Sequence, residues 1–101
     1  MSRIEATFDR LRAADQTGFV AYVTGGDPSR EATVEIACAL ADCGVDVLEL
    51  GVPFSDPLAD GATIQAAAGR ALAAGITVSN LLESLRVIRD RCPDLAIVLF
   101  T

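Results

Sequence analysis

The chain has 101 residues, of which half are apolar, and carries a net charge of −6 with a pI near 4.3. This composition fits one small globular domain and disfavours nucleic-acid binding, because phosphate backbones are bound by basic surfaces. No apolar run reaches the ~18–20 residues of a membrane span, and the charged start has no secretory core, so a cytoplasmic location is expected. Histidine and lysine are absent, so acid–base chemistry is expected from carboxylates and a Schiff-base lysine is excluded.

The first part of the chain predicts a helix, a strand and a second helix. Ser2 opens a capping box of the S-x-x-E kind, which indicates a helix start. Residues 19–24 form a short β-rich run between glycines. Asp27 is then expected as the N-cap of the next helix, with Pro28 at its first position and Gly44 just past its end.

The remainder predicts two more strands and two more helices. A strand is expected over 45–50, followed by a loop over 51–61 and an alanine-rich helix over 63–74. Thr77 can cap a further helix, and residues 96–100 read as the last strand. Nearly continuous apolar strands separated by helices indicate an α/β fold with a parallel sheet.

This order of elements fits both an open doubly wound sheet and the beginning of a (β/α) barrel. The turn after the first strand lacks the G-x-G-x-x-G fingerprint, and Pro28 stands where a dinucleotide site would need an N–H. That turn therefore weakens the nucleotide-binding alternative without excluding it. Its two glycines could instead form a phosphate nest, although the charge of Asp27 would repel an anion, and N-cap duty is favoured for that residue.

Glu49 is the most informative position for chemistry. Alternation along the second strand places it on the face opposite Leu48 and Leu50, which would pack on helices. A carboxylate near the carboxyl end of a parallel strand, removed from water, holds and gives a proton near neutral pH. The alternative is a structural glutamate paired with a buried arginine.

Asp56 and Asp60 follow on the loop that leaves the same strand end. Composition alone favours turn residues, and two acids without a further ligand make a poor metal site. Tyr22 and Phe100 share the parity that places them on the Glu49 face. They could be ordinary core residues or the walls of an apolar slot for a flat ring.

The three cysteines, Cys38, Cys43 and Cys92, have neither C-x-x-C nor zinc spacing. We expect reduced thiols that pack as small apolar residues rather than a redox or metal centre.

The run from Leu48 to Gly61, LELGVPFSDPLADG, closely resembles the signature of tryptophan synthase alpha chains. Thr63-Ile64-Gln65 continues the resemblance, and residues 22–28 resemble the first strand and turn of that family. The likeness covers essentially the whole chain. It departs at Ala62, where proline is common, and at Tyr22, where phenylalanine is common.

The resemblance implies a (β/α)8 barrel that cleaves indole-3-glycerol phosphate, in an aldol-type reaction, to indole and glyceraldehyde 3-phosphate. It implies Glu49 as proton donor and acceptor, and Asp60 as the group that holds the indole N–H. Tyr22 and Phe100 match the indole pocket.

The resemblance also implies a partner. Pro53, Asp56 and Pro57 match the surface that faces a beta subunit in an alpha2beta2 heterotetramer. The alpha chain itself needs no cofactor, because pyridoxal phosphate belongs to the beta subunit.

Three strands of eight are predicted, so residues 1–101 are expected to be the N-terminal part of a single barrel domain, apparently truncated. The phosphate site would lie outside this chain, and the chain alone is expected to be inactive and poorly stable. Two other readings stay open. One is a non-catalytic piece that only docks on a beta-like partner, and the other is a different phosphate-binding barrel, such as an isomerase.

Overall fold

A computed structural model describes residues 2–53 and 59–101. Seven elements follow in the order α1 (Arg3–Ala13), β1 (Val20–Thr24), α2 (Arg30–Asp42), β2 (Val47–Gly51), α3 (Ala62–Ala73), α4 (Val78–Arg91) and β3 (Ala96–Phe100). The three strands form one parallel sheet in the order β1-β2-β3. The predicted order and the α/β class are confirmed, and the strand predicted over 45–50 lies over 47–51.

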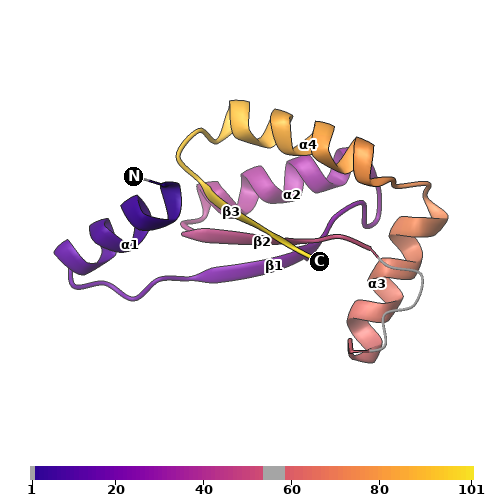
Figure 1. The fold of residues 1–101 in the computed structure, drawn as a ribbon, viewed down its shortest axis with the longest axis horizontal. Helices are drawn as coiled ribbons and strands as arrows, with labels where there is room; N and C mark the ends of the chain where they lie inside the picture. The colour runs from indigo at the N-terminus through magenta and orange to yellow at the C-terminus, as the bar shows by residue number, and fades with distance from the viewer. Residues whose placement is uncertain (1, 54–58) are drawn as a thin grey trace.

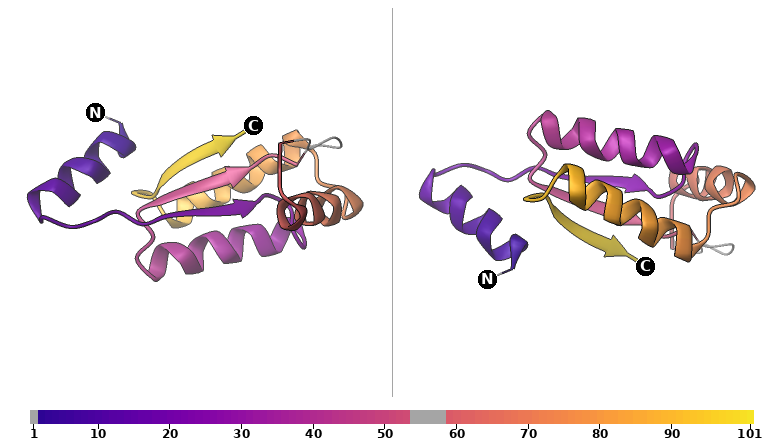
Figure 2. Two further views of the ribbon diagram at one scale, coloured as in Figure 1. Left: turned by 90° about the horizontal axis from the view of Figure 1, so that it is seen from below. Right: turned by 90° about the horizontal axis from the view of Figure 1, so that it is seen from above.

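In residues 2–53 and 59–101, helices cover only one face of this sheet. In Figures 1 and 2, α2 and α4 lie side by side on that face, and the opposite face carries no helix. The first helix stands beyond the amino ends of the strands, and α3 stands beyond their carboxyl ends (Figure 2). The carboxyl ends of the three strands therefore lie together at one end of the sheet, next to α3.

The core forms where β2 meets the two covering helices. Leu48 and Leu50 are fully buried, as their predicted parity requires. Leu48 packs in one cluster with Ala37, Ile88 and Leu95. Burying a leucine side chain stabilises a fold by about 1.5–3 kcal/mol, so this layer fixes which face of β2 points away from the helices.

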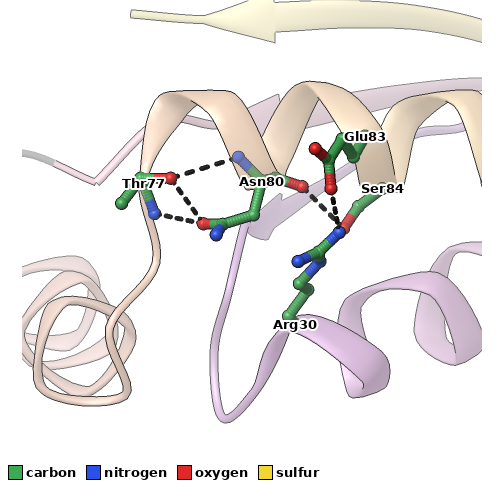
Figure 3. Close-up of polar contacts among 5 residues, drawn as sticks. All are labelled: Arg30, Thr77, Asn80, Glu83 and Ser84. Atoms are coloured by element: carbon green, nitrogen blue, oxygen red, sulfur yellow. Dashed lines mark hydrogen bonds and ion pairs between the residues drawn. The ribbon is translucent and has the colours of Figure 1, made fainter.

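Helix starts are set by side-chain caps. Ser2 accepts a hydrogen bond from the Glu5 amide, and Thr77 accepts one of 3.1 Å from the Asn80 amide. Figure 3 shows the return contact, in which the Thr77 amide donates to the Asn80 side chain. The predicted caps at Ser2 and Thr77 are confirmed.

The prediction that Asp27 caps the second helix, with Pro28 at its first position, is wrong, because α2 begins at Arg30. The N-cap of α2 is Ser29, whose hydroxyl accepts from the Ala32 amide at 3.1 Å. The carboxylate of Asp27 instead receives two hydrogen bonds from the Arg70 guanidinium, at 2.8 and 3.0 Å. Ser29, two residues further on, supplies the same kind of acceptor. Asp27 can therefore bind Arg70 and connect the turn after β1 to α3.

Polar contacts join α2 to α4 along their length. Arg30 pairs with Glu83 near the start of both helices (Figure 3). Arg91, the last residue of α4, pairs with Glu35 in the middle of α2 at 2.8 Å. Since both pairs advance along the two helices in the same order, the helices run in the same direction.

Within the described residues, no single helix is long and apolar enough to cross a membrane. Only α3 and α4 taken together, bent by 99° at their junction, meet that requirement of length and composition.

Candidate active site

Glu49 lies in the middle of the uncovered sheet face. It stands two residues before the end of β2, with Tyr22 of β1 and Val98 of β3 as its neighbours in register. Its side chain is half-buried, because this face carries no helix. No hydrogen bond or ion pair from another described residue reaches its carboxylate, so the structure gives no support to the alternative of a glutamate paired with an arginine.

Two aromatic rings lie on the same face, toward the carboxyl ends of the strands. The rings of Tyr22 and Phe100 meet edge to face, with centroids 6.0 Å apart. Both are partly open to solvent, with exposed fractions of 37% and 52%. They form one side of an apolar surface next to Glu49.

Gly51 leaves the space that the tyrosine ring occupies. A Cβ at this position would lie 1.9 Å from the Tyr22 hydroxyl oxygen and 2.6 Å from the ring carbon that bears it. Gly51 and Phe100 are neighbours in register across β2 and β3. A glycine at the end of β2 is thus required for Tyr22 to lie across the sheet and reach Phe100.

Asp60 is half-buried on the loop after β2, immediately before Gly61, the N-cap of α3. Its backbone carbonyl accepts a hydrogen bond of 2.7 Å from the Gln65 side chain, which fixes the start of the helix over the loop. A carboxylate beside a helix N-terminus is stabilised by the helix dipole. Pro53 is half-buried where the chain leaves β2, whereas Asp56 and Pro57 lie outside the described residues.

The first turn does not provide a phosphate nest. The Gly25 amide donates to the Gly51 carbonyl at 2.8 Å, and the Gly26 amide donates to the Thr33 hydroxyl at 2.7 Å. The Asp27 amide donates to the Thr24 carbonyl at 3.3 Å. All three amides have internal acceptors, so an anion bound at this turn would have to displace them.

Thr24 is a polar group that the sequence reasoning did not single out. It ends β1 on the Glu49 face and is 6% exposed. Among the described residues its hydroxyl oxygen has no hydrogen-bond partner. Buried hydroxyls are normally paired, so Thr24 joins the candidate site. The signal was present in the alternation of Val20, Tyr22 and Thr24, in which the last position is the polar one.

No metal centre is evident in residues 2–53 and 59–101, where no three histidine, cysteine or acidic side chains cluster. The chemistry that the described side chains can perform is proton transfer by carboxylates beside an apolar surface. A parallel sheet covered by helices on one face, with Glu49 on one strand and Asp60 on the loop that leaves it, is the arrangement found in the class of (β/α)-barrel proteins.

Comparison with known proteins identifies the family within that class. Residues 8–101 match the family model for the tryptophan synthase alpha chain. The tryptophan synthase alpha chain of Methylibium petroleiphilum is 52% identical over 99 residues, covering 98% of this chain and 36% of the relative. That of Halorhodospira halophila is 52% identical over 98 residues. The chain belongs to the tryptophan synthase alpha chain family, whose members are lyases of tryptophan biosynthesis.

Solved structures agree with this assignment. Subunit alpha of tryptophan synthase from Legionella pneumophila str. Paris is 41% identical and has a TM-score of 0.95, covering 98% of this chain and 38% of that one. A tryptophan synthase structure from M. tuberculosis is 33% identical, with a TM-score of 0.87. The chain spans about a third of the length of the curated relatives it matches, 36% for the first two. The fold is accordingly part of a (β/α)8 barrel, as the family resemblance implied.

Proposed function

We propose that the protein to which this chain belongs cleaves indole-3-glycerol phosphate to indole and glyceraldehyde 3-phosphate, with Glu49 as the proton-transfer group. The observation that carries the proposal is the position of Glu49. Its carboxylate lies on the open inner face in register with Tyr22, with no partner among the described residues. A partner-free carboxylate beside aromatic rings suits proton transfer to an aromatic carbon.

The proposed reaction uses one carboxyl group twice. The Glu49 carboxylic acid donates its proton to C3 of the indole ring, which makes that carbon tetrahedral and the ring iminium-like. The resulting carboxylate then removes the proton from the side-chain hydroxyl. The bond from C3 to the carbinol carbon breaks, its electron pair returns to the ring, and the hydroxyl carbon becomes the aldehyde. Glu49 ends the cycle protonated, ready for a further turnover.

Asp60 is proposed to accept a hydrogen bond from the indole N–H. Its negative charge would stabilise the positive charge that develops on the ring when C3 is protonated. The site is half-buried, which strengthens this attraction relative to bulk water. Tyr22 and Phe100 would hold the ring plane, and the Thr24 hydroxyl would offer a further polar contact at the same edge.

A beta-subunit partner is part of the proposal. Pro53, together with Asp56 and Pro57 outside the described residues, would face that partner, and the alpha chain would work without a cofactor of its own. Pyridoxal phosphate would belong to the beta subunit. We expect the 101-residue chain alone to turn over poorly, because the amides of its first turn already have internal acceptors and so do not offer a phosphate site.

The test uses the longer protein that carries this sequence. Glu49→Gln should lower the rate of indole release by about 10²–10⁴-fold, the usual contribution of general acid–base catalysis. Binding of indole itself should change little, because glutamine keeps the size of the side chain. Asp60→Asn should also lower the rate, with a weaker affinity for indole.

Glu35→Gln is the matched control. This exposed glutamate lies on α2, on the side of the sheet away from Glu49, and its substitution should leave the rate unchanged. Substantial turnover by the Glu49→Gln protein would remove Glu49 from the mechanism. Equal losses in the Glu49 and Glu35 variants would assign the effect to folding rather than to chemistry.

A further inference from the structure

Two thiols meet near the amino ends of the strands, on the helix-covered side of the sheet. Cys38 lies toward the end of α2, and Cys92 is the C-cap of α4. Their Sγ atoms are 3.6 Å apart, with the Cys92 thiol donating to the Cys38 sulfur. A disulfide bond is about 2.05 Å long, so an approach of about 1.5 Å would join them.

The surrounding structure holds the two sulfurs in this position. Cys92 packs against the buried cluster that contains Ala37 and Ile88. The exposed ion pair between Arg91 and Glu35 links the end of α4 to the middle of α2 nearby. The backbone of Cys92 is also held, because its amide donates to the Ile88 carbonyl at 2.8 Å and its carbonyl accepts from the Leu95 amide at 3.3 Å. The remaining approach of the two sulfurs therefore has to come from the side chains of Cys38 and Cys92.

The two thiols differ in access. Cys38 is 6% exposed, whereas Cys92 is half-buried and lines an open hollow of about 540 Å³ next to Arg3 and Pro93. Burial, together with the neighbouring Cys92 sulfur, raises the pKa of the Cys38 thiol. A reagent from solution therefore reaches Cys92 first, and Cys38 is placed to react with whatever forms there.

We propose that Cys38 and Cys92 are a reversible disulfide site, oxidised by low-molecular-weight disulfides of the glutathione type. The Cys92 thiolate attacks one sulfur of the oxidised reagent, forms a mixed disulfide and releases one thiolate. Cys38 loses its proton and attacks the Cys92 sulfur, which expels the second thiolate. Two protein thiols are oxidised to one disulfide, and one reagent disulfide is reduced to two thiols.

The position of this bond determines its effect. It would join the ends of α2 and α4 that lead into β2 and β3, and would close a loop of roughly 50 residues. Glu49 lies midway along β2, on the face of the sheet away from α2 and α4, and Phe100 lies at the carboxyl end of β3. The oxidised form should therefore be more resistant to unfolding while the geometry of the candidate site is unchanged.

The experiment equilibrates the chain in buffers of reduced and oxidised glutathione, with and without 8 M urea. Free thiols are then blocked by alkylation, and the products are examined by intact mass and peptide mapping. We expect native conditions to yield a Cys38–Cys92 cross-linked peptide, with Cys43 still alkylated. Formation should be favoured at least about tenfold over that in urea, because the fold holds the thiols together. Dithiothreitol should restore three free thiols.

Cys43→Ala is the matched control, because this exposed thiol should be dispensable and its variant should give the same cross-link. Cys92→Ala should leave Cys38 unmodified, and Cys38→Ala should stop the reaction at the mixed disulfide on Cys92. The proposal is overturned if native oxidation yields a Cys43 disulfide or only glutathione adducts. Equal cross-linking with and without urea would also overturn it, and this wild-type comparison needs no variant to fold. None of these outcomes bears on the lyase proposal, which concerns the opposite face of the sheet.

Discussion

Replacing Gly51 by alanine tests the most crowded contact of the candidate site. The new methyl carbon would lie 1.9 Å from the Tyr22 hydroxyl oxygen, 2.6 Å from Cζ and 3.0 Å from Cε2. Ordinary carbon contacts are about 3.5–4 Å, so the tip of the ring must withdraw by about 1.5 Å. Tyr22 is partly exposed and can move outward, at the expense of its contact with Phe100.

The expected cost follows from these contacts. Loss of an edge-to-face aromatic pair costs about 0.5–1.5 kcal/mol, and crowding at a packed position adds about 1–3 kcal/mol when the ring cannot fully escape. Together these two contributions predict that Gly51→Ala lowers the free energy of unfolding by about 1.5–4.5 kcal/mol. For a domain of this size, each kcal/mol corresponds to about 4–8 °C in the thermal midpoint.

Urea unfolding followed by circular dichroism measures this cost in three backgrounds. The cost of Gly51→Ala should be largest with Tyr22 intact. With Tyr22→Phe it should be smaller, because the hydroxyl is gone, but a cost should remain, because Cζ still lies too close. With Tyr22→Ala it should nearly vanish. Gly69→Ala is the control, because this helical glycine has open space around it and alanine there should stabilise by about 0.5–1 kcal/mol. A cost that is the same in all three backgrounds would refute the reasoning.

Three further predictions concern stability. Hydrogen bonds from the Phe19 amide and, to a smaller extent, from Arg10 lower the pKa of Asp46. The ionised carboxylate therefore stabilises the fold above the ordinary aspartate pKa, and this stabilisation is lost as the pH falls through the lowered pKa. The Asp46→Asn protein should therefore lose less stability than the wild type when urea midpoints are compared between pH 6 and pH 3. Leu48→Ala should cost about 2–5 kcal/mol because the side chain is fully buried, whereas exposed Leu82→Ala should stay within about 0.5 kcal/mol in the same urea titration. Thr77→Ala should cost about 1 kcal/mol, because it removes the cap of α4, and a thermal melt that does not shift would show that another group caps the helix.

The sequence could predict the sheet because its signals are local. Leu48, Glu49 and Leu50 alternate in polarity, and the structure buries both leucines while leaving Glu49 half-buried on the opposite face. Thr77 sits at a helix start that its own hydroxyl can cap. Such features depend mainly on residues a few positions apart, so the local sequence carries them.

The first turn shows where local reasoning fails. Asp27 has the chemistry of an N-cap, but Arg70, 43 positions later, binds its carboxylate, and Ser29 takes over as the cap. The cysteines show the same limit. Spacing gives no sign that Cys38 and Cys92 touch, since the pairing of α2 with α4 brings them together. The tyrosine ring of Tyr22 likewise occupies the space that a Cβ at Gly51 would need. This contact joins two strands, so neither residue indicates it alone.

The outer strands of the sheet have a further consequence. In the part of the chain that the structure describes, β1 and β3 each pair along one side only, and Val20, Leu99 and Phe100 on them are exposed. Free amide and carbonyl rows flanked by apolar side chains are templates on which another strand can add. In the (β/α)8 barrel of which this fold is a part, the same two edges are the sides along which further strands pair, so closure of the barrel removes both templates.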